Sequence, residues 1–322
     1  MPALFKYYAI ITAMLLSGIQ GISQERYLDQ VIDSVDLHTY TYATKDGENL
    51  NLDIYLPFYD QEESRPVILY VHGGGFSSGT RNSPGIVQFC RKLAERGYVA
   101  VSMSYRLTRK GQPTAFSCDC PANDKRNTFQ AALEDIQDAT SFLISNRESL
   151  GIDPQNIILA GSSAGAEAVL ITAYQPPNCY GLDSGPVSYA GVVSMAGAIP
   201  DIEKVYKESA IPTLFFHGTC DNLVPYATAP HHYCNPSQPG YLILHGAHTL
   251  ANRLAELEVP YWLHTTCGGK HEIASKPMDV YFDQIVEFCH TFILKGSAES
   301  RHTIIPGNGD ACNYQRFSFC AN

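Results

Sequence analysis

Two serines lie among small residues in the stretch GSSAG, residues 161–165, which matches the pattern G-x-S-x-G with Ser163 at its centre. The apolar run NIILA precedes this stretch and the helix-forming run AEAVLITAY follows it. Such a context predicts a strand, a sharp turn and a helix, which together hold the central side chain above the end of a sheet. We therefore predict that Ser163 is a nucleophile. The alternative is a glycine-rich turn with solvated serines.

A serine hydroxyl is a weak nucleophile at neutral pH, so it needs a base, an acid that orients the base, and donors for the oxyanion. The stretch HGGG, residues 72–75, follows an apolar run, and backbone without side chains can turn its N–H groups toward a ligand. We predict an oxyanion hole made by the N–H groups of Gly74, Gly75 and Ala164, with His72 fixing the loop rather than transferring protons. A purely structural turn is the alternative.

The acid and then the base are expected to follow the nucleophile along the chain. Asp221 ends the apolar run of TLFFHGTCD, and His271 follows the next such run, in YWLHTTCGGKH. Asp153 lies in a turn before the nucleophile's strand and Asp183 in a loop rich in Gly and Pro, so both fit less well. Only its position separates His271 from the other histidines, each of which can be a packed or surface residue. We predict Asp221 as the acid and His271 as the base.

The elements that must hold these residues alternate along the chain. The polar and apolar alternation around KDGEN, residues 45–49, predicts an antiparallel hairpin at the sheet edge. From Pro66 onward, short apolar runs alternate with helical segments, including a long helix over about 128–149 and a closing helix over 277–294. Residues 108–127 and 227–240 are predicted to be loops near the site. The fold class is α/β, with a mostly parallel sheet and helices on both faces.

Taken together, these motifs resemble the α/β-hydrolase superfamily, particularly the esterases and lipases with an HGGG oxyanion loop, the hormone-sensitive-lipase-like group. The resemblance runs from about Leu50 to Leu294 and rests on HGGGF, SYRL, GIDPQNI, GSSAG, HGTCDNLVP and GKHE. It implies Ser163, Asp221 and His271 as a catalytic triad, with no cofactor and no metal. The expected activity is that of a serine carboxylesterase acting on short acyl chains.

The sequence departs from that group in ways that bear on the substrate. Ser162 and Ser104 stand where members often have acidic residues, and the helix after the nucleophile begins Ala166-Glu167 rather than with a further Gly. A carbohydrate esterase removing acetyl or feruloyl groups, or a peptidase, therefore remains an alternative within the same fold. A hydrolase-like binding protein without chemistry is a further alternative.

The N-terminus predicts export. Lys6 gives a short positive region, YYAIITAMLL an apolar one, and GIS small residues before Gln24. We predict a signal peptide over 1–23, a hydrolase domain over 24–296, and a C-terminal extension over 297–322 closed by a disulfide. The apolar run is too short to span a bilayer, so no stable membrane anchor is expected. The predicted location is outside the cell or in a periplasm.

Ten cysteines suit an oxidising compartment, and without a Cys-x-x-Cys pair no zinc site is expected. Cys220 precedes the predicted acid and Cys267 lies four residues before the predicted base. Because the acid and base loops must adjoin, we predict a Cys220–Cys267 bridge; two free thiols are the alternative. Cys312 and Cys320 are expected to close a C-terminal loop.

The sequence gives fewer indications of how the other cysteines pair. The resemblance puts Cys90, in the first crossover helix, and Cys289, in the last helix, on the same face of the sheet, so they form the second predicted pair. The cysteines left for the loops beside the pocket are Cys118, Cys120, Cys179 and Cys234.

Composition limits the partners. The formal net charge is −10 and the 22 Lys and Arg residues form no basic block, so nucleic acid is not expected to bind. The expected partner is a small-molecule or polysaccharide-linked ester. Aromatic and imidazole side chains in the two predicted loops could stack on such a ligand or simply pack; they are Phe116, Tyr226, His231, His232 and Tyr233.

Overall fold

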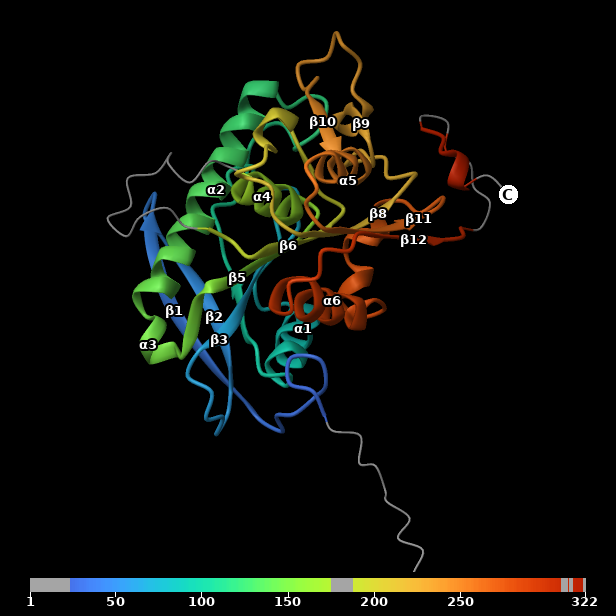
Figure 1. Cartoon of the computed structure of the whole chain (residues 1–322). Helices are drawn as coiled ribbons and strands as arrows, with labels where there is room; N and C mark the ends of the chain where they lie inside the picture. Colours follow the sequence, from blue (N-terminus) through green and yellow to red (C-terminus); the bar gives the residue numbers. More distant parts are fainter. Residues whose placement is uncertain (1–23, 175–187, 308–311, 313–314, 321–322) are drawn as a thin grey trace, which may run out of the picture.

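A central sheet with helices on both faces forms the molecule, which we describe from a computed structural model covering residues 24–174, 188–307, 312 and 315–320 (Figure 1). The sheet has nine strands in the order β1-β2-β4-β3-β5-β6-β8-β11-β12. Its strands are β1 (Val35–Lys45), β2 (Glu48–Pro57), β3 (Arg65–Val71), β4 (Val99–Met103), β5 (Ile152–Ser162), β6 (Gly191–Met195), β8 (Thr213–Gly218), β11 (Tyr261–Thr266) and β12 (Arg301–Ile305). The predicted α/β class is confirmed.

The strand directions agree with the predicted pattern. β1 and β2 form the antiparallel hairpin at one edge, and β2 also pairs antiparallel with β4. Every pairing from β4 to β12 is parallel. A small second sheet of β7 (Ala198–Ile199), β9 (Thr228–Pro230) and β10 (Ile243–Gly246) lies at the end of the molecule that carries the loops. Parallel strands buried on both faces explain the short, wholly apolar runs in the sequence.

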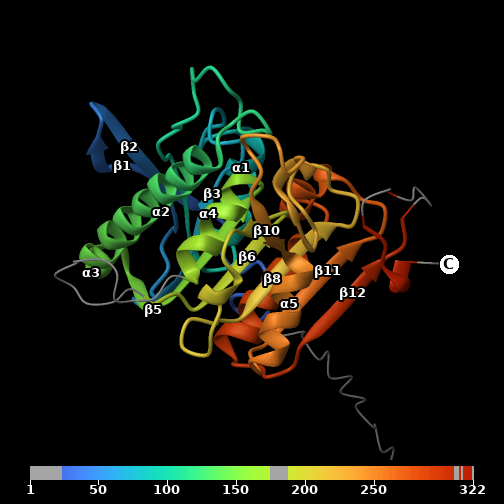
Figure 2. The same ribbon diagram turned by 90° about the horizontal axis from the view of Figure 1, so that it is seen from above.

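Two apolar cores lie on the two faces of the main sheet. One face is covered by α2 (Ala122–Ser145), α4 (Ala164–Ala173) and α5 (Ala247–Glu256), with α3 (Arg147–Leu150) following α2. The other face is covered by α1 (Pro84–Ala94) and α6 (Phe282–Phe288), as Figure 1 shows. Figure 2, seen from above, shows α2, α4 and α5 lying over the sheet.

Two predicted boundaries were wrong. Helix α2 begins at Ala122, inside the predicted loop, because Pro121 stands just before it, at a position where proline's missing N–H costs no hydrogen bond. The closing helix begins at Phe282 and continues as a π-helical turn over Cys289–Leu294, after a separate 3₁₀ turn at Lys276–Met278. Strand β12 lies in the segment predicted as a C-terminal extension, for which no strand was predicted.

Candidate active site

The stretch around Ser163 forms a sharp turn between β5 and α4. Ser163 has φ 53° and ψ −122°, a strained conformation for a residue with a side chain, and its N–H donates to Met195 O at 2.8 Å. A Cβ atom on Gly161 would lie 2.4 Å from Gly165 O, and one on Gly165 would lie 2.1 Å from Val71 O. Both positions therefore require glycine for the turn to close, as the G-x-S-x-G pattern predicts.

Ser163, His271 and Asp221 form a continuous hydrogen-bonded series. The Ser163 hydroxyl lies 2.7 Å from His271 Nε2, and His271 Nδ1 lies 2.7 Å from Asp221 Oδ2. With its proton on Nδ1, the imidazole donates to the carboxylate and accepts from the serine. These are the contacts by which a histidine can remove the proton of an attacking hydroxyl. The structure thus brings together three residues that are separated by up to 108 positions in the sequence.

The Asp221 carboxylate is fully buried and held on several sides. Its Oδ1 accepts from the N–H groups of Leu223 and Val224 at 2.9 and 3.0 Å, and His217 Nε2 lies 3.4 Å from Oδ2. Burial alone would raise the pKa of Asp221, but the hydrogen bonds from His217 and His271 outweigh it and hold the pKa well below the usual range. The carboxylate therefore stays charged. His217 was not assigned a role from the sequence, where it is only a residue inside an apolar run.

Ser162 links the nucleophile's turn to the base. Its buried hydroxyl donates to Ala274 O at 2.6 Å, at the end of the 3₁₀ turn His271–Ala274 that carries the base. The sequence motif treats this position as variable, and no local signal indicates a partner 112 residues away. The structure therefore adds Ser162 to the residues that set the distance between nucleophile and base.

The HGGG stretch lies directly against the nucleophile's turn. A Cβ on Gly73 would meet Ser162 O at 2.9 Å and Ser163 Cβ at 3.1 Å. Gly74 and Gly75 have φ of +123° and +59°, values that favour glycine. Among the described residues, the N–H groups of Gly74, Gly75 and Ala164 donate to no backbone or side-chain acceptor. Such N–H groups beside the nucleophile are what an oxyanion hole requires.

His72 fixes this loop, as predicted. Its Nδ1 donates to Gly73 O at 2.8 Å, its carbonyl accepts from the Tyr105 hydroxyl at 2.8 Å, and its ring lies 4.7 Å from the Tyr105 ring. Burial lowers the pKa of His72, so the ring is neutral near pH 7.

A buried acidic side chain lies one helical turn beyond the nucleophile. Glu167, only 1% exposed, has its Oε1 3.6 Å from Nε2 of His231, which is equally buried. Burial raises the pKa of Glu167 well above its usual value, with Lys125 opposing the effect, and burial lowers the pKa of His231 well below its usual value. Burial therefore disfavours the charged form of each group. The sequence marked Glu167 only as a departure from a family pattern.

The loop side chains that could have met a ligand lie mostly inside the protein. Phe116, Tyr226 and His231 are buried, and Phe116 packs edge-on against His231 at 5.2 Å. Their packing role is the one the structure supports. His232 is partly exposed in a left-handed conformation, with φ 55°, and burial lowers its pKa to about 4. A Cys118–Cys234 disulfide joins the two loops, which were predicted to lie beside the pocket.

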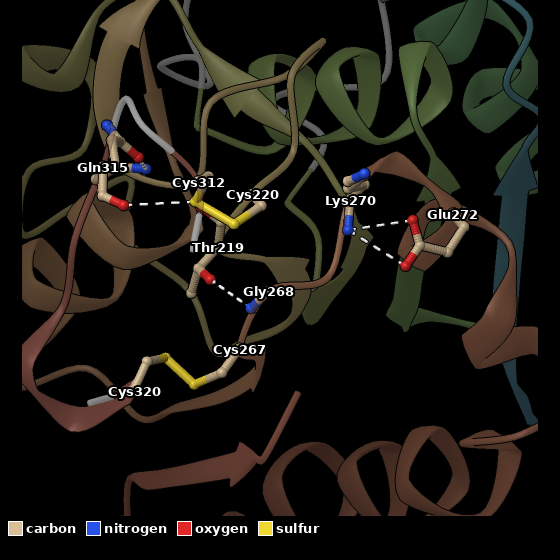
Figure 3. The surroundings of a disulfide bond; sticks show 10 residues. Thr219, Cys220, Cys267, Gly268, Lys270, Glu272, Cys312, Gln315 and Cys320 are labelled. Atoms are coloured by element: carbon tan, nitrogen blue, oxygen red, sulfur yellow. Dashed lines mark hydrogen bonds between the residues drawn. A yellow bond between two sulfur atoms is a disulfide. The ribbon is translucent and has the colours of Figure 1, made fainter. Parts of the chain in front are cut away.

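The predicted Cys220–Cys267 and Cys312–Cys320 bridges were wrong. The disulfides are Cys220–Cys312 and Cys267–Cys320 (Figure 3). The acid and base loops do adjoin, since Cys220 N–H donates to Gly269 O at 2.8 Å. However, Cys267 N–H donates to Ile305 O at 3.0 Å, so Cys267 lies beside the chain that leaves β12, and that chain supplies both partners.

The predicted Cys90–Cys289 bridge was also wrong, because both thiols are free. Cys90 and Cys289 do lie on one face of the sheet and in one apolar core, where buried thiols behave as small apolar groups. Burial raises the pKa of Cys289 to about 12. Cys120 is likewise free and buried, and Cys179 lies outside the described residues.

In the part of the chain that the structure describes, no group of three His, Cys, Asp or Glu side chains could hold a metal ion. The same part contains no helix long and apolar enough to cross a membrane. The predicted signal peptide, residues 1–23, lies outside the described residues.

Comparison with known proteins gives a family match. The model of the family described as BD-FAE matches residues 52–249, more than half of the chain, including the glycine loop, Ser163 and Asp221 but not His271. Gut esterase 1 of Caenorhabditis elegans is 33% identical over 129 residues, and chlorogenic acid esterase of Aspergillus niger is 32% identical over 184. Ethyl acetate hydrolase of Pseudomonas putida is 30% identical over 135 residues.

These alignments cover only part of this chain and only part of each relative. They cover 40%, 53% and 41% of this chain, and the chain spans 21%, 32% and 37% of those three relatives. Among solved structures, Thermogutta terrifontis esterase 2 with propionate bound has a TM-score of 0.57 and 20% identity, over 80% of this chain and 94% of its own. The same esterase phosphorylated by paraoxon has a TM-score of 0.57 at 18% identity, over 81% of this chain and 94% of its own. This likeness shows a shared fold.

Proposed function

Because the chain belongs to the BD-FAE family of α/β-hydrolases, we propose that it hydrolyses carboxylic esters with Ser163 as nucleophile, His271 as base and Asp221 as the acid that orients the base. The observation that carries the proposal is the pair of 2.7 Å contacts from Ser163 to His271 and from His271 to Asp221. The N–H groups of Gly74, Gly75 and Ala164 are the proposed oxyanion donors. The esterases among the relatives support the same chemistry.

The proposed reaction has two steps. His271 takes the Ser163 proton through Nε2 as the hydroxyl oxygen attacks the ester carbonyl, and the backbone N–H groups stabilise the oxyanion. Asp221 keeps the proton on Nδ1 and stabilises the imidazolium that forms. Collapse of the oxyanion breaks the ester bond, and His271 gives the proton to the departing alcohol. Water, activated by the same histidine, then releases the acid and restores Ser163.

Replacing the nucleophile tests this proposal. Ser163→Ala should reduce kcat on p-nitrophenyl acetate by about 10⁴-fold or more, with an unchanged circular dichroism spectrum. The matched control is Ser64→Ala, which changes an exposed serine and should keep wild-type turnover. Activity of Ser163→Ala close to that of the control would overturn the assignment.

We propose short acyl chains as the preferred substrates. The support is the ethyl acetate hydrolase relative, which its name connects with a short acyl ester, and the burial of Phe116 and Tyr226 in the loops. Across p-nitrophenyl acetate, butyrate, octanoate and palmitate, kcat/KM should be greatest for acetate or butyrate. A maximum at octanoate or palmitate would contradict this preference.

A second candidate substrate is an ester of a hydroxycinnamic acid. It is favoured by the chlorogenic acid esterase relative, whose alignment covers 53% of this chain. Methyl ferulate and chlorogenic acid, assayed beside p-nitrophenyl acetate and an acetylated sugar, distinguish the two classes. A matched amide of the best ester tests for peptidase activity, and we expect the ester to be cleaved faster.

We propose that the enzyme acts after export, with residues 1–23 removed and the hydrolase domain beginning at Gln24. The proposal is supported by the N-terminal sequence pattern and by disulfides, which persist in oxidising compartments. The N-terminal sequence of the secreted product should begin at Gln24. A product that retains Lys6 would contradict cleavage.

A further inference from the structure

The acid and the base stand on loops that follow two neighbouring parallel strands, β8 and β11. Gly218, the last residue of β8, pairs with Thr266, the last of β11. Beyond these ends the loops bind each other: Thr219 N–H donates to Thr266 O at 3.0 Å, and Gly268 N–H donates to the Thr219 hydroxyl at 2.9 Å. Figure 3 shows this contact between the two disulfides.

One further piece of chain holds both loops from the outside. We call it the C-terminal brace: strand β12 (Arg301–Ile305), Cys312 and residues 315–320. β12 pairs with β11 in parallel, at the edge of the sheet (Figure 1). Cys312 of the brace is bonded to Cys220, the residue before the acid, and Cys320 is bonded to Cys267, four residues before the base. The brace is therefore linked covalently to each loop separately.

Non-covalent contacts extend from the brace to the acid itself. The Phe317 ring packs edge-on against Tyr226 at 4.9 Å, and Tyr226 packs edge-on against His217 at 5.6 Å. His217 in turn donates to Val224 O and lies 3.4 Å from the Asp221 carboxylate. A chain of packed rings thus connects Phe317 with the acid.

The side chain of Gln315 adds a polar contact to the same region. Its Oε1 accepts from Ala227 N–H at 3.3 Å and its Nε2 donates to Thr228 O at 3.4 Å. The brace therefore contacts the segment after Asp221 through an aromatic ring and an amide, in addition to the disulfide before Asp221.

We propose that the C-terminal brace is a positioning element for the acid and the base, so that its disulfides, and Phe317 with them, set the rate of the chemical step rather than substrate binding. This inference rests on the proposed roles of Asp221 and His271. Neither strand end alone fixes these residues, because Asp221 lies three residues and His271 five residues beyond the sheet. A displacement on the order of 1 Å in a catalytic constellation can cost about 100-fold in rate.

Removing each bridge with both of its cysteines tests the proposal. We expect Cys220→Ala/Cys312→Ala to lower kcat on p-nitrophenyl acetate by about tenfold or more, and Cys267→Ala/Cys320→Ala by a similar factor, with KM within about threefold of wild type. Phe317→Ala, which leaves both bridges intact, should lower kcat by about threefold.

Titration with paraoxon separates positioning from unfolding. The number of phosphorylated sites per chain should stay at the wild-type level in the bridge variants while the rate of phosphorylation falls with kcat. A variant that merely unfolds would lose sites instead. The matched control is Cys289→Ala, which removes a buried free thiol from the core on the other face and should lower thermal stability without changing kcat.

Full kcat in both bridge variants would overturn the brace as a positioning element, as would a loss of sites proportional to the loss of kcat. The Ser163→Ala variant with all bridges intact is the separate test of the proposed function. If Ser163→Ala keeps its activity, the proposed function fails. If it loses activity while the bridge variants keep theirs, only the inference about the brace fails.

Discussion

The nucleophile and its two partners are held in place by different means. Ser163 stands on a turn of five consecutive residues with two glycines that cannot be replaced without a clash, Gly161 against Gly165 and Gly165 against Val71 of β3. Asp221 and His271 stand on loops beyond the strand ends, where disulfides, ring packing and contacts to the C-terminal brace hold them. A local sequence motif thus marks one half of the site, whereas the other half depends on disulfides and packing with a distant segment.

The largest loss of kcat is expected from a change at the acid, Asp221. Asp221→Asn should lower kcat by about 10⁴-fold, because an amide cannot hold the proton on His271 Nδ1 and leaves the imidazolium without a counter-charge. Stopped assays with p-nitrophenyl acetate measure the loss, and the urea unfolding midpoint checks that the variant folds. A loss of kcat of less than about tenfold would show that Asp221 contributes little to catalysis.

Gly165→Ala tests the local half. The new Cβ would lie 2.1 Å from Val71 O, so strand β3 or helix α4 must shift. We expect the free energy of unfolding to fall by about 3 kcal/mol, measured by urea denaturation, together with a loss of turnover. The control is Gly85→Ala, because nothing lies within 4 Å of a Cβ at that exposed helix position. Equal stability of the two variants would mean that the turn is less constrained than its geometry indicates.

This difference also explains what could be predicted from the sequence. The turn at Ser163 and the HGGG loop are local motifs, and the acid and base were predicted from their order along the chain. In the structure the parallel strands bring Ser163, Asp221 and His271 together. The disulfide partners of Cys220 and Cys267 could not be found in this way. These partners depend on the pairing of β12 with the sheet. The five residues RHTII alternate too weakly between polar and apolar side chains to predict a strand. Glu167 and Ser162 were missed because their partners are remote in sequence.

Ser162→Ala tests the contact between the two halves. Its hydroxyl donates to Ala274 O, and without it that buried carbonyl loses its donor. We expect a loss of about 1–2 kcal/mol in unfolding free energy and a fall in kcat of about fivefold, with KM little changed. The exposed Ser64→Ala serves as control. An unchanged kcat would show that Ser163 and His271 keep their relative positions without this hydrogen bond.

The smallest expected effect concerns the buried Glu167. Since burial raises its pKa in the folded state, the protein's stability declines as pH rises from the unfolded pKa toward the folded one, where the carboxyl must ionise. Glu167→Gln removes that ionisation. Its unfolding free energy relative to wild type should therefore increase as pH rises above the unfolded pKa of a glutamate. Glu208→Gln, at an exposed position, should show no such trend. A difference in unfolding free energy that stays constant as pH rises would contradict a raised pKa for Glu167.

The most direct test of the central claim is to locate the covalent product of paraoxon, which phosphorylates Thermogutta terrifontis esterase 2. Peptide mapping by mass spectrometry should find one diethylphosphoryl group per chain, on Ser163, and none in Ser163→Ala. A label on another residue, or undiminished labelling of Ser163→Ala, would contradict the proposed nucleophile.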